Sequence, residues 1–400
     1  MYSLFSCALF LYLYIGSSLF FDIVHFLLHK WSRSRCKALR WLSQCHQFHH
    51  LYYNRSLNFN PKYHRHNAFI ALPFETVCLC VGGVLSWFLL LHLTDQHSLE
   101  VQYRYPPLIA VLAIHLIRTL AVICMSGQDS NHIVYKTVPK DTNWLFVGPQ
   151  FHALHHVYPD RYMGSVTKIF DWIAGTAYSL RNKSVVITGE SGAFGSAIIR
   201  RLRDEGVRDI TGLKSGDHWT YDDFSKVRTV FDQVQPDILV LAHGTKGEDA
   251  VDANCNSSIR LIQLYLEHKQ NIGQEGAKKT LPEIWYVGSE IELHPAFGGA
   301  EMHRYLASKR AFLPYARALY DDSRVVYRHI IPAAFQSHMG KAIVSADWAA
   351  GVMAWWIRRG ARYVPVTYTG IAYLNFFKFA FWVSPNYSLG KGTAADKMCS

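Results

Sequence analysis

Residues 181–206 read RNKSVVITGESGAFGSAIIRRLRDEG, and this stretch decides the fold of the C-terminal half. A short β-branched strand leads into a glycine-rich turn, and an amphipathic helix follows. Gly189, Gly192 and Gly195 form the pattern T-G-x-x-G-x-x-G. Glycines at this spacing permit a tight turn and let backbone N–H groups approach a pyrophosphate at a helix N-terminus. The stretch therefore predicts a dinucleotide-binding strand–turn–helix unit.

Strand-like segments recur after this unit, separated by helical spacers. They read VRDITGL at 207–213, DILVLAHG at 237–244, EIWYVGS at 283–289 and RVVYRHIIP at 324–332. Such alternation is typical of a doubly wound parallel sheet. We therefore predict an α/β Rossmann-like domain over 181–345.

A tyrosine and a lysine lie between the last two of these segments, in YLASK at 305–309. Tyr305 and Lys309 are four residues apart and so share one face of a helix. An ammonium group in that position lowers the pKa of a phenol and holds it near a substrate carbonyl. The pair therefore predicts acid/base chemistry, and Ser289 at the end of a strand adds a hydroxyl.

From residue 183 to about 340, the chain resembles a short-chain dehydrogenase/reductase. By position, the resemblance implies a catalytic tetrad of Asn254, Ser289, Tyr305 and Lys309. Tyr305 would be the acid/base, Lys309 would support it and bind the ribose, and Ser289 would hold the carbonyl. Asn256 is the alternative to Asn254. A degenerate module that binds nucleotide without catalysis is the other interpretation.

The same resemblance implies a set of cofactor-binding residues. These are Thr188, Gly189, Ser191, Gly192, Gly195 and Pro332, with Ser337 in the loop on the nicotinamide side. The strand in TGLKSGD has no acid at its tip to take a ribose 2′-hydroxyl, whereas Lys214 and Ser215 can accept a 2′-phosphate. We therefore expect NADP(H) rather than NAD(H).

The spacing His-x-x-His-His occurs twice in the N-terminal part. One triplet is His46, His49 and His50, and the other is His152, His155 and His156. A helix turns by about 100° per residue, so each triplet occupies one helix face and its three nitrogens can converge on one point. Converging imidazoles predict a metal site.

Asp22, His25 and His29 precede the first triplet in the pattern D-x2-H-x3-H. With the triplets and apolar helices, residues 15 to about 180 resemble the fatty acid hydroxylase/sterol desaturase superfamily. The resemblance implies a membrane domain with a cytoplasmic diiron centre that uses oxygen and two electrons on a lipid. It implies as ligands His25, His29, His46, His49, His50, His152, His155 and His156.

The ligand set remains open at one corner. The superfamily usually has a further histidine ahead of an S-N pair, where this chain has Asp129, followed by His132. We take His132 as the ninth ligand, with Asp129 as the alternative. His64 and His66 are weaker candidates, and the spacing does not distinguish zinc from iron.

Long apolar runs lie in the first third of the chain. Residues 3–28, 76–94 and 107–125 each approach or exceed the ~20 residues that span a bilayer. The first run lacks a basic start and a small-residue cleavage site, so we interpret it as a retained helix rather than a signal peptide. We therefore predict an all-α integral-membrane domain over 1–180.

Basic residues crowd the end of the first run, which predicts a cytoplasmic exit. They are Lys30, Arg33, Arg35, Lys37 and Arg40. The link from Asp95 to Tyr105 should then lie on the far side, with both triplets and everything after residue 127 in the cytoplasm. The segment 346–400 should be an interface anchor or a lid over a lipid substrate.

Composition excludes some classes. The net charge of +11 fits anionic lipid headgroups, and no basic–aromatic motif indicates nucleic acid. The eight cysteines form no C-x-x-C pair, which favours reduced thiols over a disulfide framework.

Both parts together resemble a fused sterol desaturase and short-chain dehydrogenase. We therefore expect a multi-pass membrane oxidoreductase that hydroxylates or desaturates a lipid at two iron ions. A separate cytochrome or ferredoxin would supply electrons, because a domain that transfers hydride is poorly suited to one-electron donation. The alternative is a membrane-anchored NAD(P)-binding sensor or scaffold with a structural metal.

Overall fold

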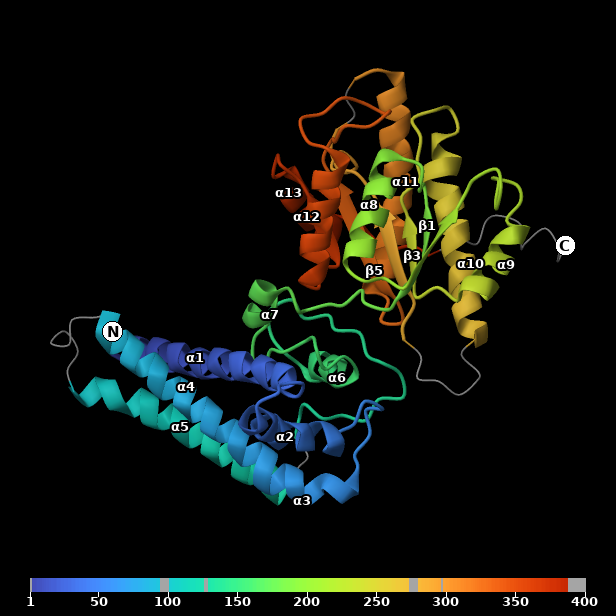
Figure 1. The fold of residues 1–400 in the computed structure, drawn as a ribbon. Coiled ribbons are helices and arrows are strands. Elements are labelled where there is room, and N and C mark those ends of the chain that lie inside the picture. Colours follow the sequence, from blue (N-terminus) through green and yellow to red (C-terminus); the bar gives the residue numbers. More distant parts are fainter. Residues whose placement is uncertain (1, 94–100, 126–128, 273–279, 296–297, 388–400) are drawn as a thin grey trace. The chain divides into compact units, whose positions relative to one another are not determined.

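The structure is a computed structural model that describes residues 2–93, 101–125, 129–272, 280–295 and 298–387. The chain divides into two compact units, Met1–Ser179 and Leu180–Ser400. The first is helical, and the second is an α/β unit (Figure 1). Each is described below by itself.

The N-terminal unit is built from seven α-helices among the described residues. They are α1 (Tyr2–Trp31), α2 (Lys37–Tyr52), α3 (His64–His66), α4 (Leu72–Leu93), α5 (Val101–Cys124), α6 (Pro149–Val157) and α7 (Ile169–Ala174). A 3₁₀ turn, η1 (Pro61–Tyr63), precedes α3, and a π-helical turn, η2 (Asn67–Ala71), joins α3 to α4. The helices α1, α4 and α5 pack against one another along their lengths (Figure 1).

Among the described residues, three helical segments are long and apolar enough to cross a membrane, judged by length and composition. They are Leu4–Trp31, Pro61–Leu93 and Tyr105–Cys124, in the regions where the sequence predicted spans. Their outward faces are apolar too, since Leu89 and Ile117 are more than half exposed. Of the link that the sequence predicts on the far side, residues 94–100 lie outside the described residues.

The histidine-bearing helices meet at the C-terminal end of α1. Helix α2 packs against α1 and against η2. Helix α6 begins with Pro149, and Gly148 precedes it. A proline is tolerated in the first turn because the N–H groups there have no hydrogen-bond acceptor within the helix. These elements therefore bring the segments around residues 29, 49 and 155 together.

The C-terminal unit contains one six-stranded sheet. Its strands are β1 (Ser184–Thr188), β2 (Asp209–Leu213), β3 (Ile238–Leu241), β4 (Glu283–Val287), β5 (Val326–Pro332) and β6 (Tyr363–Val366). Their order is β2-β1-β3-β4-β5-β6, and every neighbouring pair is parallel. The order reverses between β1 and β3, so the carboxyl ends of these two strands form a switch point, where such sheets bind ligands.

Helices cover both faces of this sheet. They are α8 (Ala193–Asp204), α9 (Ser225–Val234), α10 (Ser257–Ile272), α11 (Ala300–Asp321), α12 (Ala346–Arg358) and α13 (Ile371–Trp382), with a π-turn, η3 (Asp252–Asn256), ahead of α10. Helix α8 packs against α12, whereas α9 packs against α10. This confirms the predicted parallel Rossmann-like sheet.

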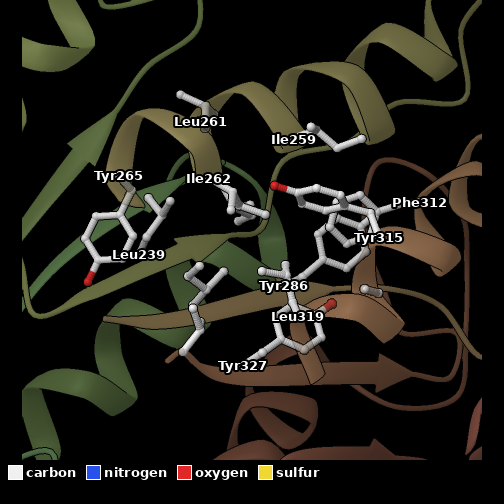
Figure 2. Close-up of a cluster of buried hydrophobic side chains, with 14 of the residues drawn as sticks. Leu239, Ile259, Leu261, Ile262, Tyr265, Tyr286, Phe312, Tyr315, Leu319 and Tyr327 are labelled. Atoms are coloured by element: carbon white, nitrogen blue, oxygen red, sulfur yellow. The ribbon is translucent and has the colours of Figure 1, made fainter. Parts of the chain in front are cut away.

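One large apolar core lies between the sheet and the helices α9, α10, α11 and α13. Figure 2 shows Tyr286 of β4 against Phe312 of α11, with ring centroids 3.9 Å apart. Strands buried on both faces explain the continuous apolar runs in the sequence. The core holds β4 and α11, which carry most of the predicted tetrad, in a fixed relation.

The stretch 346–400 contributes to this unit. Its strand β6 pairs with β5, and Phe379 of α13 lies fully buried in the core. The opposite side of α13 is open, with Leu374, Phe377 and Phe381 all more than half exposed. The expected role as interface anchor or lid stays a prediction for this exposed side.

Candidate functional site

The nine histidines that the sequence singled out as ligands assemble into two groups in the N-terminal unit. The first group is His25, His29, His46, His50 and His155; the second is His49, His132, His152 and His156. Within each group the potential ligand atoms all lie within 4.8 Å of one another. Each group could therefore hold a metal ion.

The two triplets interleave, which differs from the prediction that each converges on one point. His49 turns to the second group, while His46 and His50 on the same helix serve the first. Likewise His155 joins the first group, and its neighbour His156 joins the second. The triplet spacing spreads imidazoles across a helix face broad enough to reach two centres, so each triplet contributes to both.

Hydrogen bonds at the outer ring nitrogens orient the imidazoles. His25 Nδ1 lies 3.0 Å from the Met163 carbonyl oxygen, and His155 Nδ1 lies 2.7 Å from the Arg161 carbonyl oxygen. A carbonyl oxygen only accepts, so each Nδ1 carries the hydrogen and each Nε2 turns a lone pair inwards. His155 Nε2 lies 3.1 Å from His50 Nε2. Ring nitrogens whose lone pairs point at one another in this way suit a bound cation.

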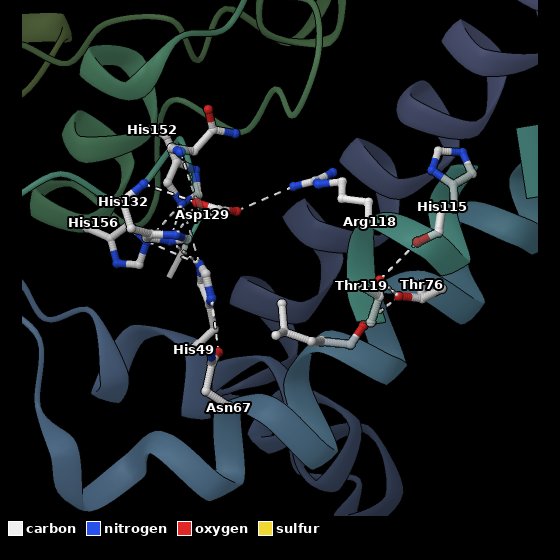
Figure 3. A network of polar contacts seen from close by, with 12 residues as sticks. His49, Asn67, Thr76, His115, Arg118, Thr119, Asp129, His132, His152 and His156 are labelled. Atoms are coloured by element: carbon white, nitrogen blue, oxygen red, sulfur yellow. Dashed lines mark hydrogen bonds and ion pairs between the residues drawn. The ribbon is translucent and has the colours of Figure 1, made fainter. Parts of the chain in front are cut away.

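In the second group, His132 rather than Asp129 lies among the other histidines (Figure 3). His132 Nε2 lies 3.0 Å from His152 Nε2, inside the group. Asp129 stands behind it, with Oδ1 2.6 Å from His132 Nδ1, and Arg118 lies 3.6 Å from its other oxygen. His132 is therefore the candidate ligand, and Asp129 orients it.

His64 and His66 belong to neither group. The His64 ring lies beside Tyr52, and the His66 ring lies 4.7 Å from the Phe48 ring, centroid to centroid. Both lie on the short α3, where His64 is half-buried and His66 is exposed.

Burial disfavours the charged form of several grouped imidazoles outside the apolar spans. It lowers the pKa of His46, His50 and His152 well below the usual value, and the pKa of His49 to about 3. Neighbouring imidazoles lower these pKa values further. Neutral imidazole is the form that ligates metals, and an all-nitrogen donor set suits iron, zinc and copper. The residues present therefore fit a two-metal centre.

In the C-terminal unit, the glycine turn forms a close backbone cradle after β1. Gly189 has φ +69°, and a Cβ there would lie 2.7 Å from the Ala242 carbonyl. A Cβ at Gly195 would lie 2.0 Å from the Gly189 oxygen. Only glycine fits either place, and α8 begins directly after Gly192. The turn therefore presents a helix N-terminus of the kind that binds a pyrophosphate.

Three of the predicted tetrad residues converge at the ends of β4 and α11. The Ser289 side chain hydrogen-bonds the Tyr305 phenol. Lys309 Nζ donates to the Val287 carbonyl at 2.8 Å and lies 5.9 Å from the centroid of the Tyr305 ring. A hydroxyl, a phenol and an ammonium therefore share one corner of the sheet.

Asn254, rather than Asn256, completes this corner. Asn254 is fully buried in η3, and its side chain donates to Ser308 Oγ at 2.7 Å. Asn256 is exposed and bonds Asp252. The Tyr286 hydroxyl donates to the Asn254 carbonyl at 2.8 Å and lies 3.4 Å from Lys309 Nζ. Tyr286 thus links Asn254 to Lys309.

Residues 185–370 match the family model of the NAD dependent epimerase/dehydratase family. The matched range begins in β1 and ends just before α13, so it includes the glycine cradle, the tetrad and all six strands. The C-terminal unit is a Rossmann domain of the epimerase and short-chain dehydrogenase type. Such a fold binds NAD or NADP.

A curated relative is a monoglucosyldiacylglycerol epimerase of Synechocystis sp., 28% identical over 268 residues. The match covers 60% of this chain and 63% of the relative, so the chain spans less than two thirds of that protein. A match of this length exceeds the span Leu180–Ser400 and so reaches into the N-terminal unit.

Solved structures similar to the chain include a short-chain dehydrogenase from Burkholderia cenocepacia in complex with NADP. Its TM-score is 0.41 at 14% identity, covering 51% of this chain and 95% of that one. A 3-ketoacyl-(acyl-carrier-protein) reductase from Brucella melitensis complexed with NADH has a TM-score of 0.36 at 18% identity. That match covers 47% of this chain and 98% of the reductase.

Burial shifts both titrating groups of the tetrad in this Rossmann domain. It raises the pKa of Tyr305 to about 12, although the hydrogen bond from Ser289 opposes this. It lowers the pKa of Lys309 to about 8, and the charge of Glu292 opposes this. The Lys309 cation is therefore present at neutral pH and lost above pH 8.

Residues that sequence reasoning missed lie directly beneath Ser289. Glu292 is fully buried; one carboxylate oxygen accepts from the Ser289 backbone N–H at 3.0 Å, and the other lies 2.7 Å from His329 Nε2. The Tyr327 hydroxyl lies 2.8 Å from His329 Nδ1. The chain position of Glu292, three residues after Ser289, was the available signal, whereas its pairing with β5 depends on the fold.

The remaining predicted cofactor residues have varied places. Thr188 Oγ1 lies 2.6 Å from His243 Nδ1 and accepts from the Ala242 N–H, so it ties β1 to β3 at the switch point. Ser191 is exposed in the cradle, and Pro332 ends β5. Lys214 follows β2 directly, with Nζ 3.6 Å from a Glu190 oxygen.

Proposed function

We propose that the protein is a membrane-bound oxidoreductase whose Rossmann domain moves a hydride to and from a carbinol carbon in the headgroup of a lipid, with epimerisation as the net result. The observation that carries this proposal is the corner formed by Ser289, Tyr305 and Lys309 beside the glycine cradle. The likeness to a lipid epimerase supports the choice of substrate.

The chemistry follows from the side chains at this corner. Bound NAD(P) supplies reversible acceptance of a hydride. The Tyr305 phenolate takes the proton of the substrate hydroxyl as the carbinol C–H bond breaks, leaving a ketone, and Ser289 donates a hydrogen bond to its oxygen. If the sugar ring turned over before the reverse reaction, the hydride would return to the opposite face of the ketone and Tyr305 would return the proton to its oxygen. Nothing is oxidised overall.

Lys309 supports this cycle electrostatically. Burial raises the pKa of Tyr305 to about 12, against the lowering expected from the sequence, so the phenolate requires a nearby cation. The Lys309 ammonium is that cation, and its bond to the Val287 carbonyl fixes its position. Lys309 also donates to the Tyr286 hydroxyl, which in turn donates to the Asn254 carbonyl, so these contacts help to hold Lys309 in place.

The apolar helices support a lipid substrate and a membrane location. Side chains such as Leu85, Phe88 and Leu116 are exposed, and at most 28% of the most apolar stretch of each candidate span is buried. A contiguous apolar surface of that size is not sustained in water, whereas a bilayer matches it.

Replacement of Tyr305 by phenylalanine tests this function, because the ring stays and only the hydroxyl is lost. We expect Tyr305→Phe to bind the dinucleotide as the wild type does and to lose epimerisation of a monoglucosyl lipid by at least ~100-fold. Sugar analysis of the recovered lipid measures the reaction. Conversion at the wild-type rate would make the Rossmann domain a nucleotide-binding module, as in a sensor.

A second candidate function, oxygen-dependent hydroxylation or desaturation of a lipid, is favoured by the nine inward-facing imidazoles. The first metal would be held by His25, His29, His46, His50 and His155, and the second by His49, His132, His152 and His156. Two bound iron ions would supply activation of oxygen. The carbonyls of Met163 and Arg161 and the carboxylate of Asp129 fix the ring orientations.

Electrons for that reaction would have to come from a separate protein such as a cytochrome or ferredoxin, because hydride transfer moves electrons in pairs. The metal claim is tested by elemental analysis after iron-replete expression. We expect about two iron ions per chain in the wild type. The iron content should fall in His155→Ala and stay unchanged in His66→Ala, because His66 is also a histidine but lies outside both groups. Two zinc ions and no iron would contradict the oxygenase.

A further inference from the structure

The tip of β2 receives a carboxylate from a different element. The strand ends at Leu213 with Lys214 next, so it has no acid of its own. Glu190 follows Gly189 in the cradle after β1, and its side chain reaches across to β2. There it occupies the space that a side chain at Gly212 would need, since a Cβ at Gly212 would lie 1.5 Å from Glu190 Oε2.

This position is available only because residue 212 is glycine. Gly212 pairs with Ile187 in the parallel register of β1 and β2, one residue before the strand ends. Any larger residue would displace the Glu190 carboxylate from the strand tip. Gly212 therefore makes room for the Glu190 carboxylate at the tip of β2. The carboxylate lies where an acidic residue of β2 itself would otherwise lie.

In a dinucleotide-binding sheet, the tip of the second strand is where the adenosine ribose binds. A carboxylate there accepts a hydrogen bond from the 2′-hydroxyl. A 2′-phosphate carries a charge of about −1.5 to −2 and is repelled by a carboxylate. Lys214 lies 3.6 Å from Glu190, but its side chain is 57% exposed against 26% for Glu190, so solvent screens the cation more than the carboxylate.

We propose that Glu190 reads the ribose 2′-hydroxyl and that the chain therefore prefers NAD(H) to NADP(H). This reverses the expectation drawn from Lys214 and Ser215, because the sequence does not reveal that the cradle supplies the acid missing from the strand. The proposal rests on dinucleotide binding by the Rossmann domain and is independent of the lipid and of the reaction.

Equilibrium binding of NADH and NADPH to the full chain in nanodiscs tests the proposal without turnover. Quenching of tryptophan fluorescence reports the two dissociation constants. We expect the wild type to bind NADH at least ~10-fold more tightly than NADPH, and Glu190→Gln to bind both within ~3-fold.

Two further variants separate the carboxylate from its neighbours. Gly212→Ala keeps Glu190 but displaces its side chain, so it should lose the NADH preference as Glu190→Gln does. Lys214→Ala keeps the carboxylate and removes the cation, so the NADH preference should persist or grow. The proposal is overturned if the wild type prefers NADPH, or if Glu190→Gln leaves an NADH preference unchanged.

Discussion

Lys309 brings a buried positive charge to the candidate acid Tyr305. Its Nζ has the Val287 carbonyl and the Tyr286 hydroxyl as partners, and burial disfavours its charged form. The folded chain thus contains a cation that titrates well below the usual range of lysine. Catalysis that depends on this cation acquires a pH limit that the amino-acid type alone does not suggest.

We expect the hydride-transfer rate to fall as pH rises through about 8, because Lys309 then loses the proton that favours the Tyr305 phenolate. The sign follows from burial, which lowers the pKa of this base, so the charge is present below pH 8 and absent above. Lys309→Arg should move the fall to higher pH, since a guanidinium stays charged. The pH dependence of single-turnover rates at saturating dinucleotide measures this. An unmoved alkaline limb in Lys309→Arg would assign it to another group.

Single residues were predictable where their signal is local. Tyr305 and Lys309 lie one helical turn apart, and the histidine triplets repeat a fixed spacing. Glu190 and Glu292 were not predictable from the sequence, because the partner of each lies on a distant strand. These partners are Gly212 and His329, respectively. A sequence presents a residue's neighbours along the chain, whereas these two depend on the register of the sheet.

At the scale of elements, the strand–turn–helix around the glycine cradle positions the cofactor end of the site. The first turn of α8 packs onto the turn itself, because Gly195 stands against the Gly189 carbonyl. Close packing of this kind ties the helix N-terminus to β1 and leaves its first N–H groups free to face a ligand. The element therefore tolerates no side chain at its closest contact.

Gly195→Ala tests that contact. Its Cβ would lie 2.0 Å from the Gly189 oxygen, so the helix must shift, and we expect the free energy of unfolding of the domain to fall by about 1–3 kcal/mol. NADH affinity should fall with it. Gly299→Ala is the matched control, because a Cβ there meets nothing within 4 Å. Chemical denaturation and fluorescence titration measure both effects, and equal behaviour of the two variants would refute the cradle.

Helices and strands with a clear hydrophobic pattern were predicted well from the sequence. Elements that depend on pairing with a distant strand were not. The strands around Ile187, Val240 and Tyr286 are buried on both faces and read as apolar runs. Strand β6 contains Pro365 and lies beyond the family motifs, so the sequence placed it in a separate tail. Likewise the helix spacing predicted one face for each triplet but not the division of that face between two metal groups.

In the whole molecule, three apolar helical segments among the described residues share one chain with two candidate sites, the histidine groups and the Rossmann corner. The candidate spans carry apolar side chains on their outward surfaces, which a bilayer would cover. If all three candidate spans of the described residues cross a bilayer, the two ends of the helical region should lie on opposite sides. The basic residues after α1 predict the cytoplasmic side for the histidines and the Rossmann domain.

Accessibility labelling tests this topology. A cysteine introduced in the link between α4 and α5 and one at the exposed Glu267 of α10 should react from opposite sides of a sealed vesicle. Native cysteines, including the exposed Cys7, Cys36 and Cys124, must first be replaced. Labelling of both positions from one side would mean that α4 and α5 do not both cross the membrane.

The central claim, that the chain performs hydride chemistry on a lipid headgroup, is tested most directly by product analysis of one lipid. Purified full chain in nanodiscs is supplied with a monoglucosyldiacylglycerol and NAD⁺, and both the intact lipid mass and the released sugar are determined. The account predicts an epimeric sugar at unchanged lipid mass, absent with Tyr305→Phe, whereas oxygenase action would add one oxygen atom or remove two hydrogens. An unchanged sugar with the dinucleotide bound, or conversion that survives Tyr305→Phe, would contradict the claim.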